Sequence, residues 1–309
     1  MKSMLDARDR LADLLREVAR GIVKVDEPMS KHTTFGIGGP ADVYIEPTDA
    51  DDLASVMARV AERGLPWFVF GDGANLLVSD KGIRGLVIKM GRPFSKIKIE
   101  GELVTVGSAA KLDKVVSATV GAGLSGLEYA AAIPGTVGGA IVMNAGTYRG
   151  QIGDVTEQVS VVTNDGRRLD LTPEDLQFGY RWSMFQADPS KIIVGALLRL
   201  RRGEKEELVR MMEAVRRRRA INLPSVGRSA GCVFKNPDGV SAGQLIDQAG
   251  LKGLAVGDAV VADRHANFIL NMGRAAAADV RELAERVRGA VKDKFGIELE
   301  YEIRIVGDW

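Results

Sequence analysis

The chain has 309 residues, of which 46% are hydrophobic and 27% are charged, a balance that is typical of a globular protein and excludes disorder, collagen and a coiled coil. Its 42 Lys and Arg residues almost balance its 41 Asp and Glu residues, and the net charge of +1 gives no overall field to attract nucleic acid or an anionic membrane. A single Cys excludes an internal disulfide, and no apolar run reaches the roughly eighteen residues that a membrane span needs. The charged N-terminal stretch lacks the hydrophobic segment of a secretion signal, so we expect a cytoplasmic protein of about two domains.

Hydrophobic periodicity in the first half of the chain predicts helices that alternate with strands. The clearest helix signal is the pair of N-cap residues Thr48 and Asp49, followed by an apolar stripe and then by Gly64, a residue type that commonly ends helices. In chain order, the expected elements are helices over 5–22, 49–64 and 111–120, and strands over 67–71, 85–90 and 102–110.

The second half is predicted to contain a β-hairpin, further strands and three helices. Asn164-Asp165-Gly166 is a strong turn signal between two strands. The remaining expected elements are a strand over 191–200, a helix over 204–219 with Met211 on its buried face, a capped helix over 241–250, a strand over 265–271, a helix over 279–294 and an alternating strand over 297–306. Because short strands mix with helices and no βαβ period continues through the chain, the sequence predicts an α+β fold.

Glycine is the enriched residue type, with 36 residues, or about 12% against an average of about 7%. Two segments concentrate it, GDGANLL (71–77) and IPGTVGGAIVMNAG (133–146). Glycine lets backbone N–H groups approach a ligand, and successive amides form a concave site for phosphate. Two such loops suit a ligand with a diphosphate and flat rings, although tight turns in a glycine-rich sheet remain the alternative. Neither loop matches the Rossmann or P-loop pattern.

Eight motifs, in order along residues 28–307, resemble those of the UDP-N-acetylenolpyruvoylglucosamine reductase family. They are HTTFGIGGPADVYIEP (32–47), FGDGANLLVSD (70–80), IPGTVGGAIVMNAGTY (133–148), FGYRWSMF (178–185), SAGCVFKNP (229–237), SAGQLIDQAGLKG (241–253), HANFILN (265–271) and FGIELEYEIRIVG (295–307). The resemblance implies an FAD-binding domain of the vanillyl-alcohol-oxidase (PCMH) type and a C-terminal α+β substrate-binding domain. With the composition change near Arg202–Gly203, it gives a lead-in over 1–30 and domains over 31–202 and 203–309.

The family resemblance implies an NADPH-dependent flavoenzyme that reduces the enolpyruvyl ether of a UDP-sugar to UDP-N-acetylmuramate for peptidoglycan synthesis. FAD would be held non-covalently, NADPH would donate hydride, and the substrate would receive hydride at C3 and a proton at C2. The predicted FAD contacts are Gly71, Asp72, Gly73, Ala74, Asn75, Leu76, Ile133, Pro134, Gly135, Thr136, Gly138, Gly139, Ala140 and Asn144. The loop reads GDGAN where GGGSN is commoner, so Ala74 loses a hydroxyl contact to the diphosphate while the backbone donors remain.

Three residues are predicted to be catalytic by the same resemblance. Arg181 would stabilise the negative charge that spreads into the substrate carboxylate, because its guanidinium can bind a carboxylate through two hydrogen bonds. Cys232 stands where the family normally has Ser as proton donor, and a thiol with an ordinary pKa near ~8.5 is the easier donor. Glu302 would assist protonation, and the predicted substrate contacts are Tyr180, Lys235 and Asn236.

Several details refine the resemblance or leave alternatives open. Only six residues separate Phe185 from Ile192, so the chain resembles the shorter subtype without a tyrosine loop. Which arginine of 216–219 or 228 meets the diphosphate stays open. His32 and His265 are expected to be structural, and no residues have metal-ligand spacing.

No obligate protein partner is implied. The rival functions are an FAD-dependent alcohol or lactone oxidase on the same fold, and a protein that binds nucleic acid through its arginine clusters.

Overall fold

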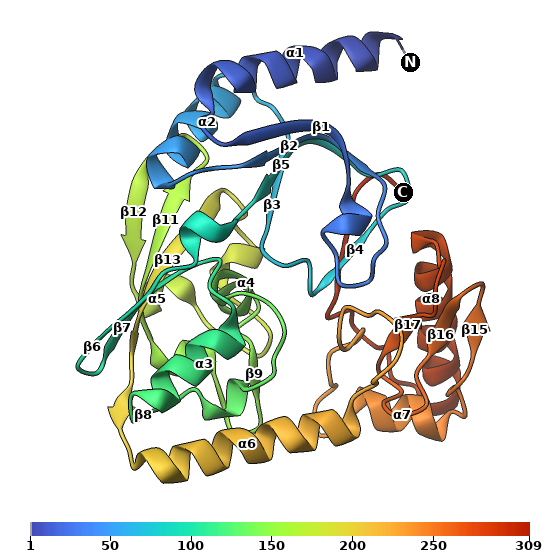
Figure 1. Ribbon diagram of the computed structural model, residues 1–309. Coiled ribbons are helices and arrows are strands. Elements are labelled where there is room, and N and C mark those ends of the chain that lie inside the picture. Colours follow the sequence, from blue (N-terminus) through green and yellow to red (C-terminus); the bar gives the residue numbers. More distant parts are fainter. Residues whose placement is uncertain (1) are drawn as a thin grey trace. The chain divides into compact units, whose positions relative to one another are not determined.

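The structure is a computed structural model that describes residues 2–309, with side chains described from residue 8 onward (Figure 1). Met1, where the first predicted domain begins, lies outside the described residues. The chain forms two compact units, each built from separate stretches of sequence. The first unit comprises the residues up to Asp26, Asp42–Asp72 and Gly85–Arg218, and the second comprises Glu27–Ala41, Gly73–Arg84 and Arg219–Trp309. The predicted domains (1–30, 31–202 and 203–309) are contiguous in sequence and follow the domains of the family, whereas the two units follow contacts in space. The predicted bounds therefore stay a prediction.

A five-stranded antiparallel sheet in the order β12-β11-β13-β7-β6 forms a large part of the first unit. Its strands are β6 (Ile97–Glu100), β7 (Leu103–Gly107), β11 (Thr156–Thr163), β12 (Arg168–Leu171) and β13 (Lys191–Arg199). β11 and β12 pair on either side of Asn164-Asp165-Gly166, which confirms the predicted hairpin. The helices α3 (Leu112–Gly121) and α4 (Val137–Val142) bury apolar residues in the same core cluster as these strands.

A second sheet, most of whose residues belong to this unit, has the strand order β1-β2-β5-β3. Its strands are β1 (Ile22–Pro28), β2 (Pro40–Glu46), β3 (Trp67–Phe70) and β5 (Ile83–Lys89). The helices α1 (Lys2–Val18) and α2 (Ala50–Glu62) share a core cluster with it. Asp49 caps α2, since its carboxylate accepts a hydrogen bond from the Asp52 backbone N at 2.9 Å, as the sequence predicts.

The remaining elements of the first unit are short, apart from one long helix. They are β8 (Leu124–Ser125), β9 (Gly146–Thr147), β10 (Gly150–Gln151), α5 (Pro173–Leu176), β14 (Arg201–Arg202) and α6 (Lys205–Asn222). α6 continues past Arg218, so the chain leaves the first unit within this helix.

The second unit combines a three-stranded sheet, a strand pair and two helices. Its elements are β4 (Leu76–Val78), α7 (Ala242–Gln248), β15 (Ala255–Val256), β16 (Ala259–Val261), β17 (Ile269–Asn271), α8 (Ala277–Phe295) and β18 (Arg304–Val306). β18 runs parallel to β4, with Arg304 opposite Leu76. α8 ends at Gly296, whose φ of +71° is a conformation that glycine adopts readily. The predicted α+β fold is confirmed.

The first and last predicted elements are shorter than expected. The helix predicted over 5–22 ends at Val18, because the Arg20 N donates to the Asp52 Oδ1 at 2.8 Å instead of continuing the helical hydrogen bonds. The strand predicted over 297–306 is regular only in β18, because the chain changes partner: the Glu302 N donates to the Val233 carbonyl, whereas the Arg304 N donates to the Asn75 carbonyl.

Other expectations fail locally. The strand predicted over 265–271 is regular only in β17, because the Phe268 N donates to the His265 carbonyl and forms a turn. Met211 is 38% exposed rather than buried. Neither β4 nor α4 is predicted by the sequence; β4 begins at the end of the first glycine-rich segment, and α4 lies inside the second.

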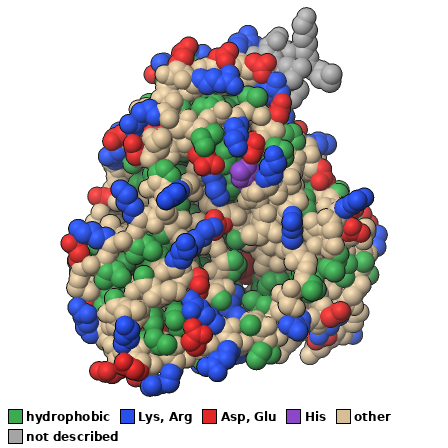
Figure 2. All heavy atoms as spheres, viewed as in Figure 1, with side chains coloured by type: hydrophobic (Ala, Val, Ile, Leu, Met, Phe, Trp, Pro, Cys, Tyr) green, Lys and Arg blue, Asp and Glu red, His purple; other side chains and the backbone are tan. Residues whose placement is uncertain are grey.

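Charged side chains of both signs are interspersed on the face of the molecule shown in Figure 2, as expected from nearly equal numbers of acidic and basic residues. Among residues 2–309, no helix is long and apolar enough to cross a membrane. Among the side chains that the structure describes, from residue 8 onward, no group of three or more His, Cys, Asp and Glu residues could hold a metal ion.

Candidate functional site

The first glycine-rich loop begins where β3 ends. Gly71 approaches the second loop so closely that a Cβ on it would lie 2.4 Å from the Thr136 Oγ1. Asp72 forms ion pairs with Lys111 and with Lys89, whose Nζ lies 3.9 Å from the Asp72 Oδ1. Burial lowers the pKa of the Lys89 ammonium, with Asp72 opposing this shift. The Lys89 Nζ also donates to the Gly71 carbonyl, so the beginning of this loop is held by charge as well as by packing.

The rest of this loop, from Gly73 onward, belongs to the second unit. Gly73 has a φ of +62°, and a Cβ on it would lie 2.2 Å from the His32 carbonyl oxygen, so no other residue fits there. The Asn75 Nδ2 donates to the Glu302 carbonyl at 3.0 Å, and the Asn75 carbonyl accepts from the Arg304 N at 2.9 Å. Asn75 therefore attaches the predicted cofactor loop to the strand that carries Glu302.

The second glycine-rich loop is attached to the beginning of α3. The Leu112 N donates to the Gly135 carbonyl at 3.0 Å, and the Gly138 N donates to the Ser108 carbonyl at 2.8 Å. Thr136 caps α4, because its Oγ1 accepts from the Gly139 N at 3.3 Å. These bonds hold the loop without using the side chain of Ser108.

The residues of this loop fit a bound cofactor. Ser108 is 2% exposed, and within the described part of the chain its Oγ has no hydrogen-bond partner. A Cβ at Gly138 would lie 3.0 Å from the Ser108 Cβ, so glycine keeps this side of the loop open to close approach. A polar cofactor bound here could form the hydrogen bond that the buried Ser108 hydroxyl lacks, and it could approach the backbone closely at Gly138, which has no side chain.

Asn144 connects the second loop to the predicted catalytic Arg181. It is fully buried, its Nδ2 donates to the Gly179 carbonyl at 2.8 Å and to the Gln151 Oε1 at 3.0 Å, and its Oδ1 accepts from the Gly153 N at 3.0 Å. A hydrogen bond donated by the Asn144 side chain to the cofactor would have to replace one of the two bonds from Nδ2, because that nitrogen carries only two hydrogens. The predicted FAD contact stays a prediction, and the structure shows a positioning role that the sequence does not reveal.

Arg181 lies in a tight turn in which the backbone N of Gly179 and that of Trp182 each donate to the other residue's carbonyl at 3.1 Å. Its φ of +51° is uncommon for a residue other than glycine, and such strain often occurs at functional sites. The Arg181 Nη2 donates to the Gly146 carbonyl at 3.0 Å, and the guanidinium lies 5.3 Å from the centroid of the Tyr180 ring. Tyr180 is 54% exposed, so the predicted substrate contact lies at the surface of the first unit.

Cys232 and Glu302 lie on neighbouring segments of the second unit. Cys232 pairs with Phe268 on one side, while the carbonyl of the adjacent Val233 accepts from the Glu302 N at 2.8 Å on the other. Cys232 is half-buried, and the Gly231 before it has a φ of +83°. Backbone pairing therefore brings two of the three predicted catalytic residues together in one unit.

The two other predicted substrate contacts follow Cys232 along the chain. The Lys235 N donates to the Glu300 carbonyl at 2.8 Å, and its Nζ lies 3.2 Å from the Glu300 Oε2. The Asn236 Oδ1 accepts from the Ala242 N at 3.0 Å, just before α7. Both side chains have protein partners, and their substrate contacts stay predictions.

The arginines left open by the sequence have different surroundings. Arg216 is engaged with Asp113 and Glu213, whereas the Arg218 Nη1 donates to the Tyr148 hydroxyl at 2.8 Å. Arg228 lies against Gly36, where a Cβ would be 2.4 Å from the Arg228 Nη1. Of these three, Arg216 is the one most fully bound within the protein.

The two histidines have protein contacts. The His32 Nε2 lies 2.9 Å from the Glu27 Oε1. The ring of His265 packs edge-on against Phe268 at 4.9 Å, and burial lowers the pKa of this imidazole. Both environments agree with structural roles.

Comparison with known protein families identifies two matching regions. Residues 41–172 match the family described as FAD binding domain, and residues 223–306 match the family described as UDP-N-acetylenolpyruvoylglucosamine reductase, C-terminal domain. The first region contains both glycine-rich loops in full, and the second contains Cys232 and Glu302.

Curated relatives match almost the whole chain. A UDP-N-acetylenolpyruvoylglucosamine reductase of Heliobacterium modesticaldum is 46% identical over 290 residues, which cover 94% of this chain and 92% of the relative. The enzyme of that name from Caldanaerobacter subterraneus subsp. tengcongensis is 42% identical over 97% of this chain and 98% of its own length. Among solved structures, UDP-N-acetylenolpyruvylglucosamine reductase from Thermus caldophilus superposes with a TM-score of 0.80 at 40% identity, covering 93% of this chain and 98% of that chain.

Proposed function

This chain belongs to the UDP-N-acetylenolpyruvoylglucosamine reductase family, and on that premise we propose that Arg181, Cys232 and Glu302 carry out its chemistry. The chain is an FAD-dependent oxidoreductase that reduces the enolpyruvyl ether of UDP-N-acetylglucosamine-enolpyruvate to UDP-N-acetylmuramate in peptidoglycan synthesis. FAD, held by the two glycine-rich loops, would supply at this site the hydride chemistry that links NADPH to C3 of the enol ether.

Arg181 is proposed to bind the substrate carboxylate and to stabilise the negative charge that builds up at C2. A guanidinium matches a carboxylate through two parallel hydrogen bonds, and such electrostatic stabilisation is a large contribution to catalysis. The strained turn at Arg181 supports this role, because three side-chain hydrogen bonds, made by Asn144, Gln186 and Arg181 itself, maintain its conformation.

Cys232 is proposed to donate the proton to C2 from its Sγ. Its backbone is fixed on both sides by pairing to Phe268 and, through Val233, to Glu302, so the thiol has a defined position. Glu302 is proposed to assist this protonation. The observation that carries the proposal is a pair of hydrogen bonds at Glu302. The Glu302 N donates to the carbonyl of Val233, next to Cys232, and the Glu302 carbonyl accepts from Asn75 of the GDGAN loop, although these segments are far apart in sequence.

The two glycine-rich loops are proposed to hold FAD, with Ser108 as an additional hydrogen-bond donor or acceptor beside the second loop. Tyr180, Lys235 and Asn236 are proposed to contact the UDP-sugar. We also place the enzyme in the cytoplasm, where nucleotide-sugar substrates and NADPH are available, and we propose no obligate protein partner.

The proposal is tested by following flavin absorbance in the purified protein through both half-reactions. We expect a yellow protein that NADPH bleaches and that the enolpyruvyl UDP-sugar reoxidises under anaerobic conditions. Glu302→Ala should bind FAD and be reduced by NADPH at the normal rate but be reoxidised slowly by substrate. Equal slowing of both half-reactions would contradict the role of Glu302. Rapid reoxidation by oxygen, with none by the UDP-sugar, would indicate the alcohol or lactone oxidase instead.

A further inference from the structure

Ala132, which immediately precedes the second glycine-rich loop, has a left-handed backbone conformation. Its φ is +59°, and an L-residue other than glycine loses about 1–2 kcal/mol in that region. The next four residues, Ile133–Thr136, are predicted to contact FAD. The path of the Ile133–Thr136 loop therefore depends on the contacts that stabilise the left-handed conformation of Ala132.

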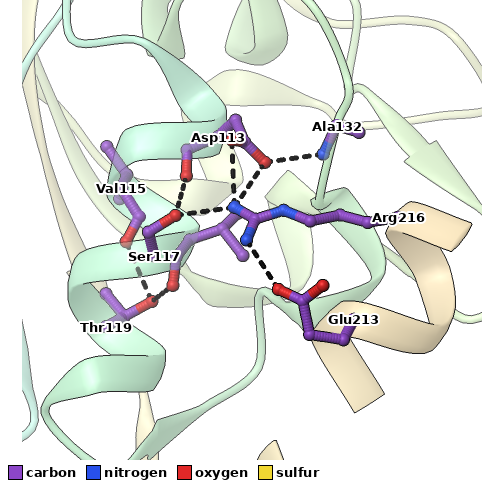
Figure 3. A network of polar contacts seen from close by, with 8 residues as sticks. Asp113, Val115, Ser117, Thr119, Ala132, Glu213 and Arg216 are labelled. Carbon is purple, nitrogen blue, oxygen red and sulfur yellow. Dashed lines mark hydrogen bonds and ion pairs between the residues drawn. The ribbon is translucent and has the colours of Figure 1, made fainter. Parts of the chain in front are cut away.

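Asp113 supplies that stabilisation from the first turn of α3. Its Oδ1 accepts a hydrogen bond from the Ala132 N at 2.7 Å (Figure 3). The adjacent Leu112 donates its backbone N to the Gly135 carbonyl at 3.0 Å. The beginning of α3 thus holds the loop at two points, one through the backbone and one through a carboxylate.

Arg216 on α6 fixes the orientation of this carboxylate. Its Nη2 lies 3.1 and 3.0 Å from the two Asp113 oxygens and donates to the Ser117 Oγ at 2.7 Å, while its Nη1 donates to the Glu213 Oε1 at 3.0 Å (Figure 3). An exposed ion pair alone would contribute little. Here the guanidinium has three partners, and its side chain is only 28% exposed. Lys, with its single compact ammonium group, cannot reproduce this geometry.

We propose that Arg216 and Asp113 are positioning residues that set the conformation of the Ile133–Thr136 loop, and thereby the affinity for FAD and the environment of the flavin. The inference rests on the proposed function, because it takes this loop to contact FAD. Neither residue is proposed to touch the reacting atoms. Asp113 acts through the Ala132 backbone, and Arg216 acts through Asp113.

The test measures FAD binding to apoprotein by flavin fluorescence, together with the visible circular dichroism of the bound flavin. Arg216→Ala should weaken FAD binding about tenfold, equivalent to about 1.4 kcal/mol, and should change the flavin spectrum. Arg216→Lys should give most of the same loss. Arg210→Ala is the matched control, because Arg210 is an exposed residue of the same helix, and it should bind FAD like the wild type.

A rescue experiment separates positioning from a general loss of stability. In the Arg216→Ala background, Ala132→Gly should restore FAD affinity to within about threefold of wild type, because glycine adopts the left-handed conformation without strain. A merely structural role of Arg216 would lower the melting temperature without changing the affinity or spectrum of the folded protein, and that result would overturn the inference. Failure of Ala132→Gly to rescue would also overturn it.

Two further outcomes are distinguishable. If Arg216→Ala does not fold, Asp113→Asn replaces it, since Asn can still accept the Ala132 hydrogen bond but loses the charge that attracts Arg216. Unchanged FAD affinity in Asp113→Asn and in Arg216→Lys would then refute the inference. If the wild-type protein itself binds no FAD, the proposed function fails, not only the positioning role.

Discussion

The segments that carry Arg181 and Cys232 are held in place by different kinds of contact. In the second unit, Cys232 and the adjacent Val233 pair through their backbone with Phe268, Asn267 and Glu302. These bonds do not depend on the identity of the Cys232 side chain. A substitution at Cys232 can therefore change the chemistry while leaving the position of the neighbouring groups intact.

In the first unit, the turn at Arg181 depends on side chains. The described backbone bonds of Gly179 and Trp182 join these two residues to each other. Its connections to other segments come from the Asn144 Nδ2, from the Gln186 Nε2 that donates to the Arg181 carbonyl at 2.9 Å, and from the Arg181 guanidinium itself. The contrast implies that remote side chains control the geometry around Arg181 more strongly than they control the geometry around Cys232.

The largest effect is expected from Cys232→Ala. Loss of a positioned proton donor should slow reoxidation of the flavin by substrate by about 10²–10⁴-fold, with flavin reduction by NADPH unchanged. Because backbone pairing is unaffected, the melting temperature should stay within the error of the wild-type value. Cys232→Ser is the matched control and should retain substantial activity, since a hydroxyl can also donate the proton. An inactive Ser variant would show that the thiol has a role that a hydroxyl cannot fill.

Arg181→Ala should resemble Cys232→Ala in kinetics but differ in stability. Reoxidation by substrate should slow by about 10²–10³-fold, because charge stabilisation is lost. The free energy of unfolding should also fall by about 1 kcal/mol, because the hydrogen bond to the Gly146 carbonyl disappears. Chemical denaturation measures this difference. If Arg181→Ala and Cys232→Ala are equally stable, the proposed contrast between the two segments is wrong.

Asn144→Ala sharpens the contrast without touching a predicted catalytic residue. It leaves the buried groups that bonded to its amide without partners, and we expect the free energy of unfolding to fall by about 3 kcal/mol. The turn at Arg181 should loosen, so the KM for the UDP-sugar should rise in the folded variant.

The second unit offers a matched variant, Asn267→Ala. Asn267 is also buried, and its side chain bonds to both backbone groups of Phe234, at 3.0 and 2.8 Å. Stability should fall by a similar amount, but the KM should change less, because Val233 keeps its backbone bond to Asn267 and Cys232 keeps its pairing to Phe268. An equal rise in KM in both variants would remove the distinction.

The sequence predicts those features that depend on local patterns. The cap at Asp49, the hairpin at Asn164-Asp165-Gly166 and the end of α8 at Gly296 are confirmed because each depends on a few neighbouring residues. The family resemblance, carried by ordered motifs, gave the fold class and FAD, and both are confirmed. The roles of individual site residues stay predictions.

The contacts that position those residues could not be predicted, because they join segments that are distant in sequence. Arg216 and Asp113 are separated by 103 positions, and a run of four arginines gives no sign of which one pairs with Asp113. The left-handed conformations of Ala132 and Arg181 were equally hidden, since Gly, Asn and Asp are the residue types that signal such backbone. Asn144 was assigned to the cofactor from its motif, whereas its three hydrogen bonds depend on where the chain returns.

The smallest expected effect is on the stability of the protein at low pH, and it again distinguishes the segment that follows Arg181 from the segment that follows Cys232. Hydrogen bonds from Lys191 and then Ser190 lower the pKa of Asp188, a few residues beyond Arg181, from 3.8 to about 2. A lowered pKa means that the stabilising contribution of Asp188 is complete above pH 3.8 and is lost as the pH falls through about 2. Asp188→Asn should therefore flatten the fall in melting temperature between about pH 4 and 2. The control Asp238→Asn, at an exposed position in the second unit, should retain the wild-type profile, and an unchanged profile in Asp188→Asn would show that these contacts do not hold the loop after Arg181.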